Sequence, residues 1–414
     1  MCVDIQGKRI TPQVAKVSGS AVRIIEKNKV GFHYANTPCD RTTQIERALK
    51  SARIPDTQYQ WGITFPESQH YPAVEGICDP GIECAEVSDV ADYCLEILED
   101  LSIYGISAKG VCYCRKSHFT LQNSKGIDVE EKSTYFMLDL DVNQGETAFN
   151  VVKSCRLWDK NSEPLVDAIK EQVSWYTRKG NKNENRKGNK NGSRSKNRTG
   201  EPSTAYAFGS RALYAVLRPF IWQLSIDRAK RGISKIKLES IAGESFTLLD
   251  DGKIFNGVGT SLCDGEGIPS NQYYIIEKGI LRQFMYDHFH ALLDKKESTG
   301  NAVRTSMMAP PKIAPRNLVV KEGTQSLSEF TGVLIEEVVN DKGANLVSGE
   351  YTFNCKRAFQ VRDGEILGLV DPFVLKGSIF DILQNIYDTG KIKENPFPCY
   401  RELLTPYVFI QISS

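Results

Sequence analysis

The sequence predicts an α+β fold, with an N-terminal α/β sandwich-like domain followed by a β-rich C-terminal domain of mixed sheets and flanking helices. Three observations lead to this prediction. The chain has 414 residues, more than one small hydrophobic core accommodates. Two segments with helical periodicity precede a run of strands in the first half. Short strands separated by glycines dominate the second half. We therefore expect domains at 1–160 and 203–414, joined by a helix and a basic insertion at 161–202.

The first expected elements are strands. Residues 14–35 alternate between apolar and polar types, with turn residues at 18–20 and 26–28, which predicts a short strand meander. One face of this meander is expected to carry four apolar side chains, those of Val22, Ile24, Val30 and Phe32. A longer helix and strand would usually precede this unit in the family described below, so we expect a trimmed first domain.

Helices and strands then follow in the N-terminal half. Residues 41–54 predict an amphipathic helix that begins at a capping threonine, and residues 87–101 predict a second one. Three strands are expected after them, at 110–113, 118–121 and 134–138. The segment 123–126 has the composition of a turn between the last two strands. Residues 165–176 predict another helix.

A basic run at 178–198 interrupts the chain. It holds nine lysines or arginines against one acid, Glu184, and almost no apolar residues. Such a segment cannot bury enough surface to offset its ordering entropy, so we expect a disordered insertion. It could tether a nucleic acid or an acidic partner, or it could be a solvated linker. The absence of aromatic residues among the charges favours the linker.

In the C-terminal half the pattern predicts a strand at 205–209 and a long helix at 211–231, which Pro219 would kink or begin. Residues 272–286 predict a hairpin with its turn at 277–279. Further strands are expected at 317–320, 333–338, 346–353, 357–361 and 407–412, and helices at 326–330 and 375–387.

Charge and cysteine content narrow the classes of protein to which this chain could belong. Lysine plus arginine (52) nearly balances aspartate plus glutamate (51), so the net charge of +1 gives no global attraction to nucleic acid or to an anionic membrane. The eleven cysteines are scattered and odd in number, which suits reduced thiols better than a disulfide framework. The sequence lacks an apolar leader and a membrane-spanning stretch. We expect a soluble, cytoplasmic protein.

Four ordered motifs occur in the C-terminal half: Asp264-Gly265-Glu266-Gly267-Ile268-Pro269, Ile276-Glu277-Lys278-Gly279-Ile280-Leu281, Ser298-Thr299-Gly300-Asn301 with Arg304, and Ser348-Gly349-Glu350-Tyr351. Their order and spacing resemble the TldD/PmbA family, also called modulators of DNA gyrase or TldD/TldE peptidases. Members of the TldD kind carry an HExxxH helix that binds zinc, with the glutamate able to act as general base. Members of the TldE/PmbA kind lack this helix.

This chain resembles the second kind. Aligned on Phe208-Gly209, it offers Arg218, Pro219 and Gln223 where the zinc-binding members have histidine, glutamate and histidine. An arginine repels zinc and a proline has no side-chain base. The resemblance implies a non-catalytic subunit that works with a zinc-carrying, TldD-like partner on unfolded or small peptides. The alternative is a homodimeric binding or regulatory protein with no peptidase role.

Five residues of the glycine-rich loops are candidates for contacting a peptide or a partner: Asp264, Glu266, Thr299, Asn301 and Arg304. The same residues could instead cap turns, with Arg304 and Glu266 forming an ion pair. No catalytic residue is predicted. His288 and His290 are weak metal candidates, because on a strand both imidazoles would share one face. Cys399 lies near the position of a cysteine ligand in TldD-like proteins, but its flanking pattern differs.

Overall fold

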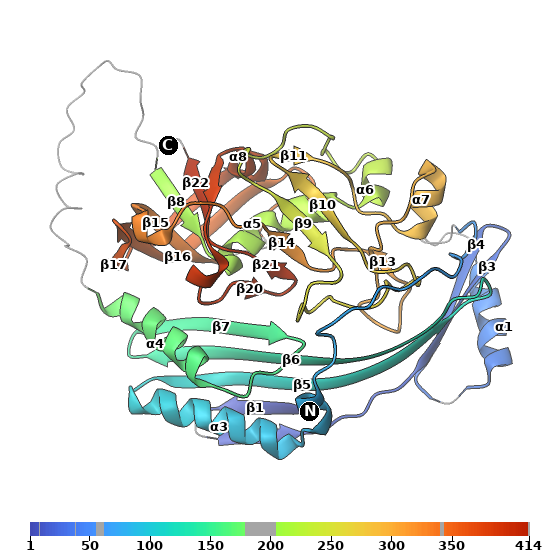
Figure 1. Ribbon diagram of the computed structural model, residues 1–414, viewed down its shortest axis with the longest axis horizontal. Coiled ribbons are helices and arrows are strands. Elements are labelled where there is room, and N and C mark those ends of the chain that lie inside the picture. The colour runs from blue at the N-terminus through green and yellow to red at the C-terminus, as the bar shows by residue number, and fades with distance from the viewer. Residues whose placement is uncertain (8, 38, 55–61, 179–203, 340–342, 413–414) are drawn as a thin grey trace.

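The computed structural model describes residues 1–7, 9–37, 39–54, 62–178, 204–339 and 343–412. It has an α+β architecture, as the sequence predicts. A five-stranded antiparallel sheet underlies the N-terminal half, in the order β2-β1-β5-β6-β7 (Figure 1). Its strands are β1 (Cys2–Gln6), β2 (Arg9–Gln13), β5 (Ser107–Gln122), β6 (Asp128–Gln144) and β7 (Thr147–Cys155). Helices α3 (Val87–Ile103) and α4 (Glu163–Thr177) pack on this sheet in one hydrophobic core, and α2 (Pro80–Cys84) is short.

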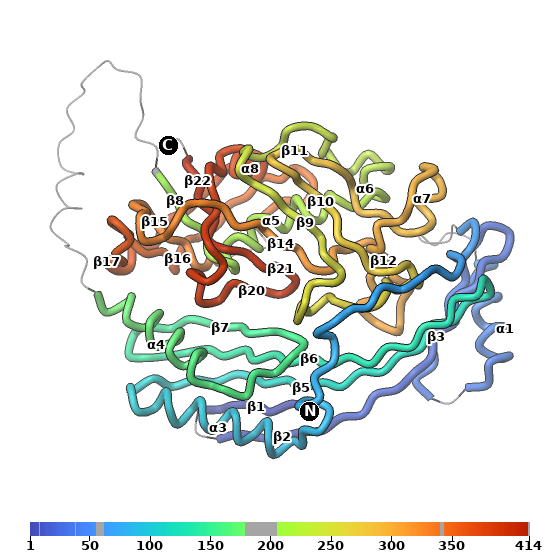
Figure 2. The backbone as a smooth tube through the Cα atoms, in the orientation of Figure 1, coloured from blue at the N-terminus to red at the C-terminus, as the bar shows by residue number. Residues whose placement is uncertain are grey.

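Strands β5 and β6 are the longest elements of the sheet, with 16 and 17 residues. The prediction of two separate strands at 110–113 and 118–121 was wrong, because both segments belong to the single strand β5. Polar residues such as Arg115 and Lys116 interrupt the apolar pattern, but pairing with β6 continues through them without a break. The two strands run together along the molecule beneath the C-terminal half (Figure 2).

A separate hairpin lies near the far end of β5 and β6. It consists of β3 (Ser20–Glu26) and β4 (Lys29–Ala35), and α1 (Arg41–Ala52) packs against it. Asp40 is the N-cap residue of this helix, and its carboxylate accepts hydrogen bonds from the backbone N–H groups of Thr42 and Thr43. The expected threonine cap was therefore wrong, because an aspartate just upstream satisfies the free N–H groups of the first turn. The residues before this hairpin, expected to be trimmed, form β1 and β2.

In the C-terminal half, α5 (Ser210–Gln223) and side chains of two mixed sheets form one hydrophobic core. The first sheet has the order β11-β10-β9-β14-β21-β20 and the second β17-β16-β15-β8-β22-β19, with β18 also paired to β16. The strands of the first sheet are β9 (Leu248–Asp251), β10 (Gln272–Glu277), β11 (Ile280–Leu281), β14 (Leu318–Val320), β20 (Cys399–Tyr400) and β21 (Leu403–Leu404). Those of the second are β8 (Thr204–Phe208), β15 (Gly332–Val339), β16 (Glu350–Arg362), β17 (Glu365–Leu369), β18 (Phe373–Ser378), β19 (Ile386–Thr389) and β22 (Val408–Ile412).

Smaller elements complete this half and correct several expectations. They are α6 (Ile226–Lys230), α7 (His288–Asp294), α8 (Ile379–Gln384), the small pair β12 (Ala302–Val303) and β13 (Lys312–Ile313), and the short helices Leu327–Glu329 and Ile392–Glu394. The predicted helix 375–387 is β18, α8 and β19 instead, and the strands predicted at 346–353 and 357–361 are the single strand β16. The long helix predicted at 211–231 is two helices, α5 and α6, and Pro219 does not begin the first of them, since α5 runs from Ser210 to Gln223.

The two halves are joined by buried polar contacts. Arg156, at the end of β7, donates to the carbonyl oxygens of Thr134 and Thr260 at 3.2 and 3.0 Å. Glu131 of β6 accepts hydrogen bonds from Ser261 Oγ and from the backbone N–H of Leu262, both at 2.6 Å. The basic run 178–198 lies outside the described residues except for Arg178. Within the described part of the chain, no helix has both the length and the apolar character needed to cross a membrane.

Candidate functional site

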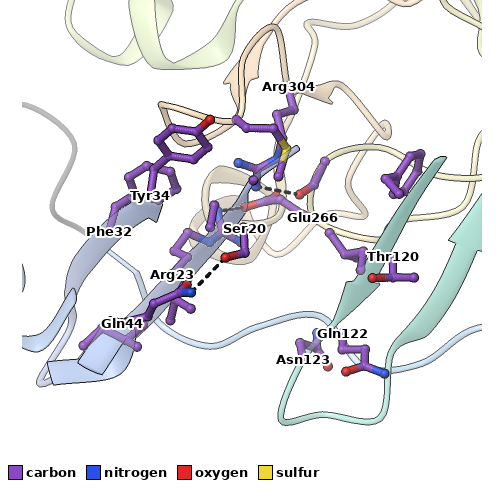
Figure 3. A pocket seen from close by; sticks show the side chains of 18 of the residues that line it. Ser20, Arg23, Phe32, Tyr34, Gln44, Thr120, Gln122, Asn123, Glu266 and Arg304 are labelled. Carbon is purple, nitrogen blue, oxygen red and sulfur yellow. Dashed lines mark hydrogen bonds and ion pairs between the residues drawn. The ribbon is translucent and has the colours of Figure 1, made fainter. Parts of the chain in front are cut away.

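A groove of about 1490 Å³ lies where the β3–β4 hairpin, the end of the β5–β6 ribbon and the glycine loops of the C-terminal half meet. Figure 3 shows Arg23, Glu266 and Arg304 close together in this groove, with Thr120, Gln122 and Asn123 at the end of β5. Its lining mixes charged, polar and apolar side chains. Three separate parts of the sequence build it, so no single motif predicts it.

One face of the β3–β4 hairpin forms a wall of the groove. Arg23 pairs with Phe32 and Ala21 with Tyr34 across the hairpin, so these side chains share a face. Val22 lies opposite His33, on the face that α1 covers. The expectation that Val22 and Ile24 share a face with Val30 and Phe32 was wrong. The register pairs odd-numbered β3 residues with even-numbered β4 residues, which places the two sets on opposite faces.

Glu266 is the polar centre of the groove. Its carboxylate accepts from Arg23 Nη1 at 2.7 Å and from the backbone N–H of His288 at 2.9 Å. The side chains of Arg23 and Glu266 are 19% and 8% exposed, so this ion pair is largely shielded from water. The sequence suggested an ion pair between Arg304 and Glu266, but Glu266 pairs with Arg23 instead. The β3–β4 hairpin brings Arg23 to the loop from a position 243 residues away.

Arg304 also lines the groove, and within the described parts of the chain it forms no ion pair. Its guanidinium donates to the carbonyl oxygens of Ala309 at 3.1 Å and of Gly265 at 3.4 Å. Burial, together with repulsion from the Arg23 guanidinium, lowers the pKa of Arg304 to about 10. The charged form still dominates at neutral pH.

Asp264 holds two loops together. Its carboxylate accepts from the backbone N–H groups of Glu266 at 2.9 Å, Ile268 at 3.0 Å and Ala302 at 3.0 Å. The side chain is buried, and burial together with the nearby Glu266 carboxylate raises the pKa of Asp264 to about 7. Asp264 therefore connects the first glycine loop to the second rather than facing a ligand.

Asn301 and Thr299 lie behind the groove wall. The Asn301 amide donates to Asp250 Oδ2 at 2.6 Å and accepts from the Tyr273 hydroxyl at 2.7 Å. Thr299 Oγ1 accepts from the backbone N–H of Tyr286 at 2.7 Å. These contacts fix the second glycine loop on β9 and β10. Of the five predicted residues, only Glu266 and Arg304 line the groove.

His288 and His290 lie on α7, not on a strand, so the expected shared face was wrong. Residues two apart on a helix point about 200° apart. His290 Nδ1 lies 2.7 Å from Asp287 Oδ1, while His288 Nε2 is buried without a hydrogen-bond partner among the described residues. Across those residues, no three His, Cys, Asp or Glu side chains are grouped closely enough to hold a metal ion.

Helix α5 carries the three positions aligned with the zinc motif. Pro219 and Gln223 are buried in the core, and Gln223 Oε1 accepts from the backbone N–H of Lys235 at 3.0 Å. Arg218 is partly buried. A cation, a ring without a donor and an amide do not fit a zinc ion, which prefers imidazole, thiolate and carboxylate ligands. Cys399 lies on β20 beside the end of β7, and burial raises the pKa of its thiol to about 11.

Two strand edges border the groove. β5 pairs with β1 only up to Tyr113 but with β6 as far as Gln122. Cys114 exchanges backbone hydrogen bonds with Met1 on the β1 side, at 2.8 and 3.0 Å. Because backbone groups alternate in direction along a strand, those of His118, Thr120 and Gln122 point to the same edge. Among the described residues, that edge and the outer edge of β3 have no strand partner.

Sequence reasoning missed Arg23 as a site residue. A signal was available, since Arg23 is a lone charge in the apolar strand Ala21-Val22-Arg23-Ile24-Ile25. A charge in such a strand needs a partner or a ligand. The contributions of Phe32, Tyr34, Met307 and Met308 to the groove carried no comparable signal, because their types are common in cores and on surfaces.

Comparisons with known proteins bear on this arrangement. The chain is 27% identical over 417 residues to the Uncharacterized protein MJ0231 of Methanocaldococcus jannaschii, covering 95% of this chain and 89% of that one. It is 30% identical over 156 residues to the Metalloprotease TldD homolog of Buchnera aphidicola subsp. Acyrthosiphon pisum, covering 37% of this chain and 32% of that protein. That match spans about a third of the relative.

Among solved structures, TldE from Thermococcus kodakarensis has a similar fold, with a TM-score of 0.79, 19% identity, and coverage of 100% of this chain and 94% of that one. The sequence model of the PmbA/TldA metallopeptidase C-terminal domain matches residues 204–413, which include α5, both mixed sheets and the glycine loops of the groove. The chain therefore belongs to the TldD/PmbA family of metallopeptidase-related proteins.

Proposed function

We propose that this chain is a non-catalytic, TldE/PmbA-like subunit that holds an unfolded or small peptide while a zinc-carrying, TldD-like partner cleaves it. The groove beside Arg23, Glu266 and Arg304 is the peptide site in this proposal. The main supporting observation is that Arg23, Arg304 and two strand edges that have no strand partner among the described residues border one groove. The proposed domains remain 1–160, the 161–202 connection and 203–414, and the family match starting at residue 204 supports the last of these.

The chemistry of α5 supports a role without zinc in this chain. Hydrolysis by a zinc peptidase needs an open metal position and a base next to it. Pro219 offers no base, and the buried Gln223 amide already accepts a backbone hydrogen bond. The metal and the general base would therefore come from the partner.

The strand edges support binding of an extended peptide. A peptide can add to an exposed sheet edge through main-chain hydrogen bonds, which recognise the backbone rather than a sequence. The β5 edge offers the backbone groups of His118, Thr120 and Gln122. Such an edge suits unfolded peptides, because most strands of a folded protein are already paired or are protected at the sheet edge.

The first experiment separates catalysis from assistance. The purified chain is mixed with zinc and a fluorescently labelled unstructured peptide, with and without a family member that carries HExxxH. We expect no cleavage by this chain alone and faster cleavage when both proteins are present. Chelator-sensitive cleavage by this chain alone would contradict the proposal.

Co-purification from the source cells separates the proposal from the alternative. Recovery with a chain bearing HExxxH supports the accessory role, and recovery only as a homodimer supports a binding or regulatory protein without a peptidase role. A cytoplasmic location is part of the proposal, and the eleven free cysteines support it. DNA binding through the basic run 178–198 is not part of it, because no aromatic residues stand among its charges.

A further inference from the structure

The groove holds more positive than negative charge. Three arginines line it, Arg23, Arg41 and Arg304, against two acids, Asp128 and Glu266. Glu266 already accepts from Arg23 and from the backbone N–H of His288. Among the lining side chains one positive charge is therefore in excess, in a partly dehydrated place where an uncompensated charge is unfavourable. A ligand with one negative charge would relieve this imbalance.

Arg304 has donors available for such a ligand. A guanidinium carries five N–H donors in a planar fork, and the two bonds to the Ala309 and Gly265 carbonyl oxygens use two of them. These bonds also fix the side chain, so little rotamer entropy is lost when a ligand binds. Arg23 and Arg304 line the same groove, and repulsion by Arg23 contributes to the lowered pKa of Arg304.

The charged cluster lies beside the open end of β5. The loop that carries Glu266 packs on this strand, since a Cβ atom added to Gly267 would lie 2.8 Å from Leu121 Cδ2. Arg23 lies over the Phe65 ring, 5.2 Å from its centroid, and Tyr34 and Met308 also line the groove. An anion bound here would thus lie next to apolar side chains and to the backbone groups on the open edge of β5.

The geometry points to recognition of the C-terminal carboxylate of an extended peptide by Arg304 and Arg23, with the preceding residues along the open edge of β5. This inference rests on the proposed peptide-holding function and adds which end of the peptide is bound. A carboxylate matches the single surplus charge, whereas a phosphate group would bring up to two. Arg pairs with carboxylates through two parallel hydrogen bonds, which fixes orientation as well as affinity.

The test compares two forms of one probe. An N-terminally fluorescein-labelled hexapeptide of alternating serine and valine is prepared as the free acid and as the C-terminal amide, and binding to the full chain is followed by fluorescence anisotropy. We expect the acid to bind at least about 10-fold more tightly than the amide, because the amide cannot form the charge-assisted pair with the arginines.

Three variants assign the effect. Arg304→Gln should remove most of the preference for the acid over the amide. Glu266→Gln should strengthen binding of the acid, because it frees Arg23 while the amide oxygen can still accept from the His288 N–H. A variant that merely disordered the loop would weaken binding, so this gain separates recognition from damage. Arg53→Gln is the matched control, since it removes an arginine from an exposed ion pair with Glu26 outside the groove.

The possible results separate the carboxylate inference from the peptide-holding function. Equal binding of acid and amide would overturn this inference and leave the peptide-holding function standing. Failure of both peptides to bind, alone and with a TldD-like partner, would overturn both. Displacement of the acid by inorganic phosphate at a lower concentration than acetate would replace the carboxylate with a phosphate ligand. Retention of the full acid preference by a folded Arg304→Gln variant, checked by its melting temperature, would also reject the assignment.

Discussion

Arg23 and Glu266 form an ion pair with a distance of 2.7 Å between Nη1 and Oε1, although 243 residues separate them in the sequence. The pair fastens the β3–β4 hairpin to the first glycine loop of the C-terminal half. It thereby sets the distance between two walls of the groove. The shape of the groove depends on this contact as well as on the packing of α1 against the hairpin.

Replacing Arg23 with glutamine should destabilise the protein. Glu266 would stay buried without its cationic partner, and an unsatisfied group of this kind costs about 1–3 kcal/mol. The free energy of unfolding in urea measures the loss, and hydrogen exchange should show weaker protection of β3 and β4. The control is Arg53→Gln, whose exposed pair with Glu26 should contribute about 1 kcal/mol or less. Equal losses in the two variants would contradict the structural role of the Arg23–Glu266 pair.

Gly31 should tolerate no side chain. A Cβ atom at this position in β4 would lie 1.9 Å from the carbonyl oxygen of Ala48 in α1, so the helix would have to move away from the hairpin. We expect Gly31→Ala to lower stability by about 1–3 kcal/mol, as overpacking usually does, and to weaken peptide binding by widening the groove. The melting temperature and the anisotropy assay measure the two effects.

Gly105 provides the control for Gly31. Its backbone has a φ of 69°, and a Cβ atom there would meet nothing within 4 Å. Gly105→Ala should therefore cost only the left-handed backbone strain, about 1–2 kcal/mol, with unchanged peptide binding. Unchanged binding in both variants would show that the position of α1 does not govern the groove.

The open edge of β5 can be tested with proline. Thr120→Pro removes a backbone N–H that faces the open edge, so it should weaken peptide binding with little loss of stability. Leu121→Pro removes an N–H that faces β6 and should destabilise the protein by about 1–3 kcal/mol, because a carbonyl oxygen of β6 loses its hydrogen-bond donor. Unfolding in urea and fluorescence anisotropy separate these effects. Full peptide affinity in a folded Thr120→Pro variant would argue against strand addition at β5.

Stability should depend on the protonation of Asp264. Its pKa is raised to about 7 by burial and by the Glu266 carboxylate, from an ordinary value of 3.8. The folded state therefore binds this proton more tightly than the unfolded state, and stability falls as the pH rises from about 4 to about 7. Asp250, whose pKa is raised to about 6 by burial, acts in the same direction.

The measurement is the slope of unfolding free energy against pH between 5 and 8. Asp264→Asn cannot titrate at this position, so its slope should be smaller than that of the unchanged protein, whatever the absolute loss of stability. Comparing slopes avoids the complication that asparagine cannot accept all three backbone hydrogen bonds made by Asp264. Identical slopes would show that Asp264 is ionised throughout this range.

Local pattern predicted many elements because their periodicity is unambiguous. The helix expected at 165–176 is α4, and the strand at 333–338 is β15. The segment 375–387 failed because Leu375, Ile379, Ile382 and Leu383 have helical spacing over part of their length. Pairing of β18 with β16 and of β19 with β22 overrides that spacing at both ends. Long-range hydrogen bonding decided these residues, and a local pattern contains no information about it.

The sequence by itself determined the α+β class, the glycine loops and the resemblance to the TldD/PmbA family, because these depend on residue types and short spacings. Only the tertiary structure decided which charges meet. Arg23 rather than Arg304 pairs with Glu266, and Asp264 connects two loops instead of facing a ligand. The reason is that contacts between distant residues depend on the path of the whole chain. The same path leaves one edge of the end of β5, the edge opposite β6, without a strand partner among the described residues.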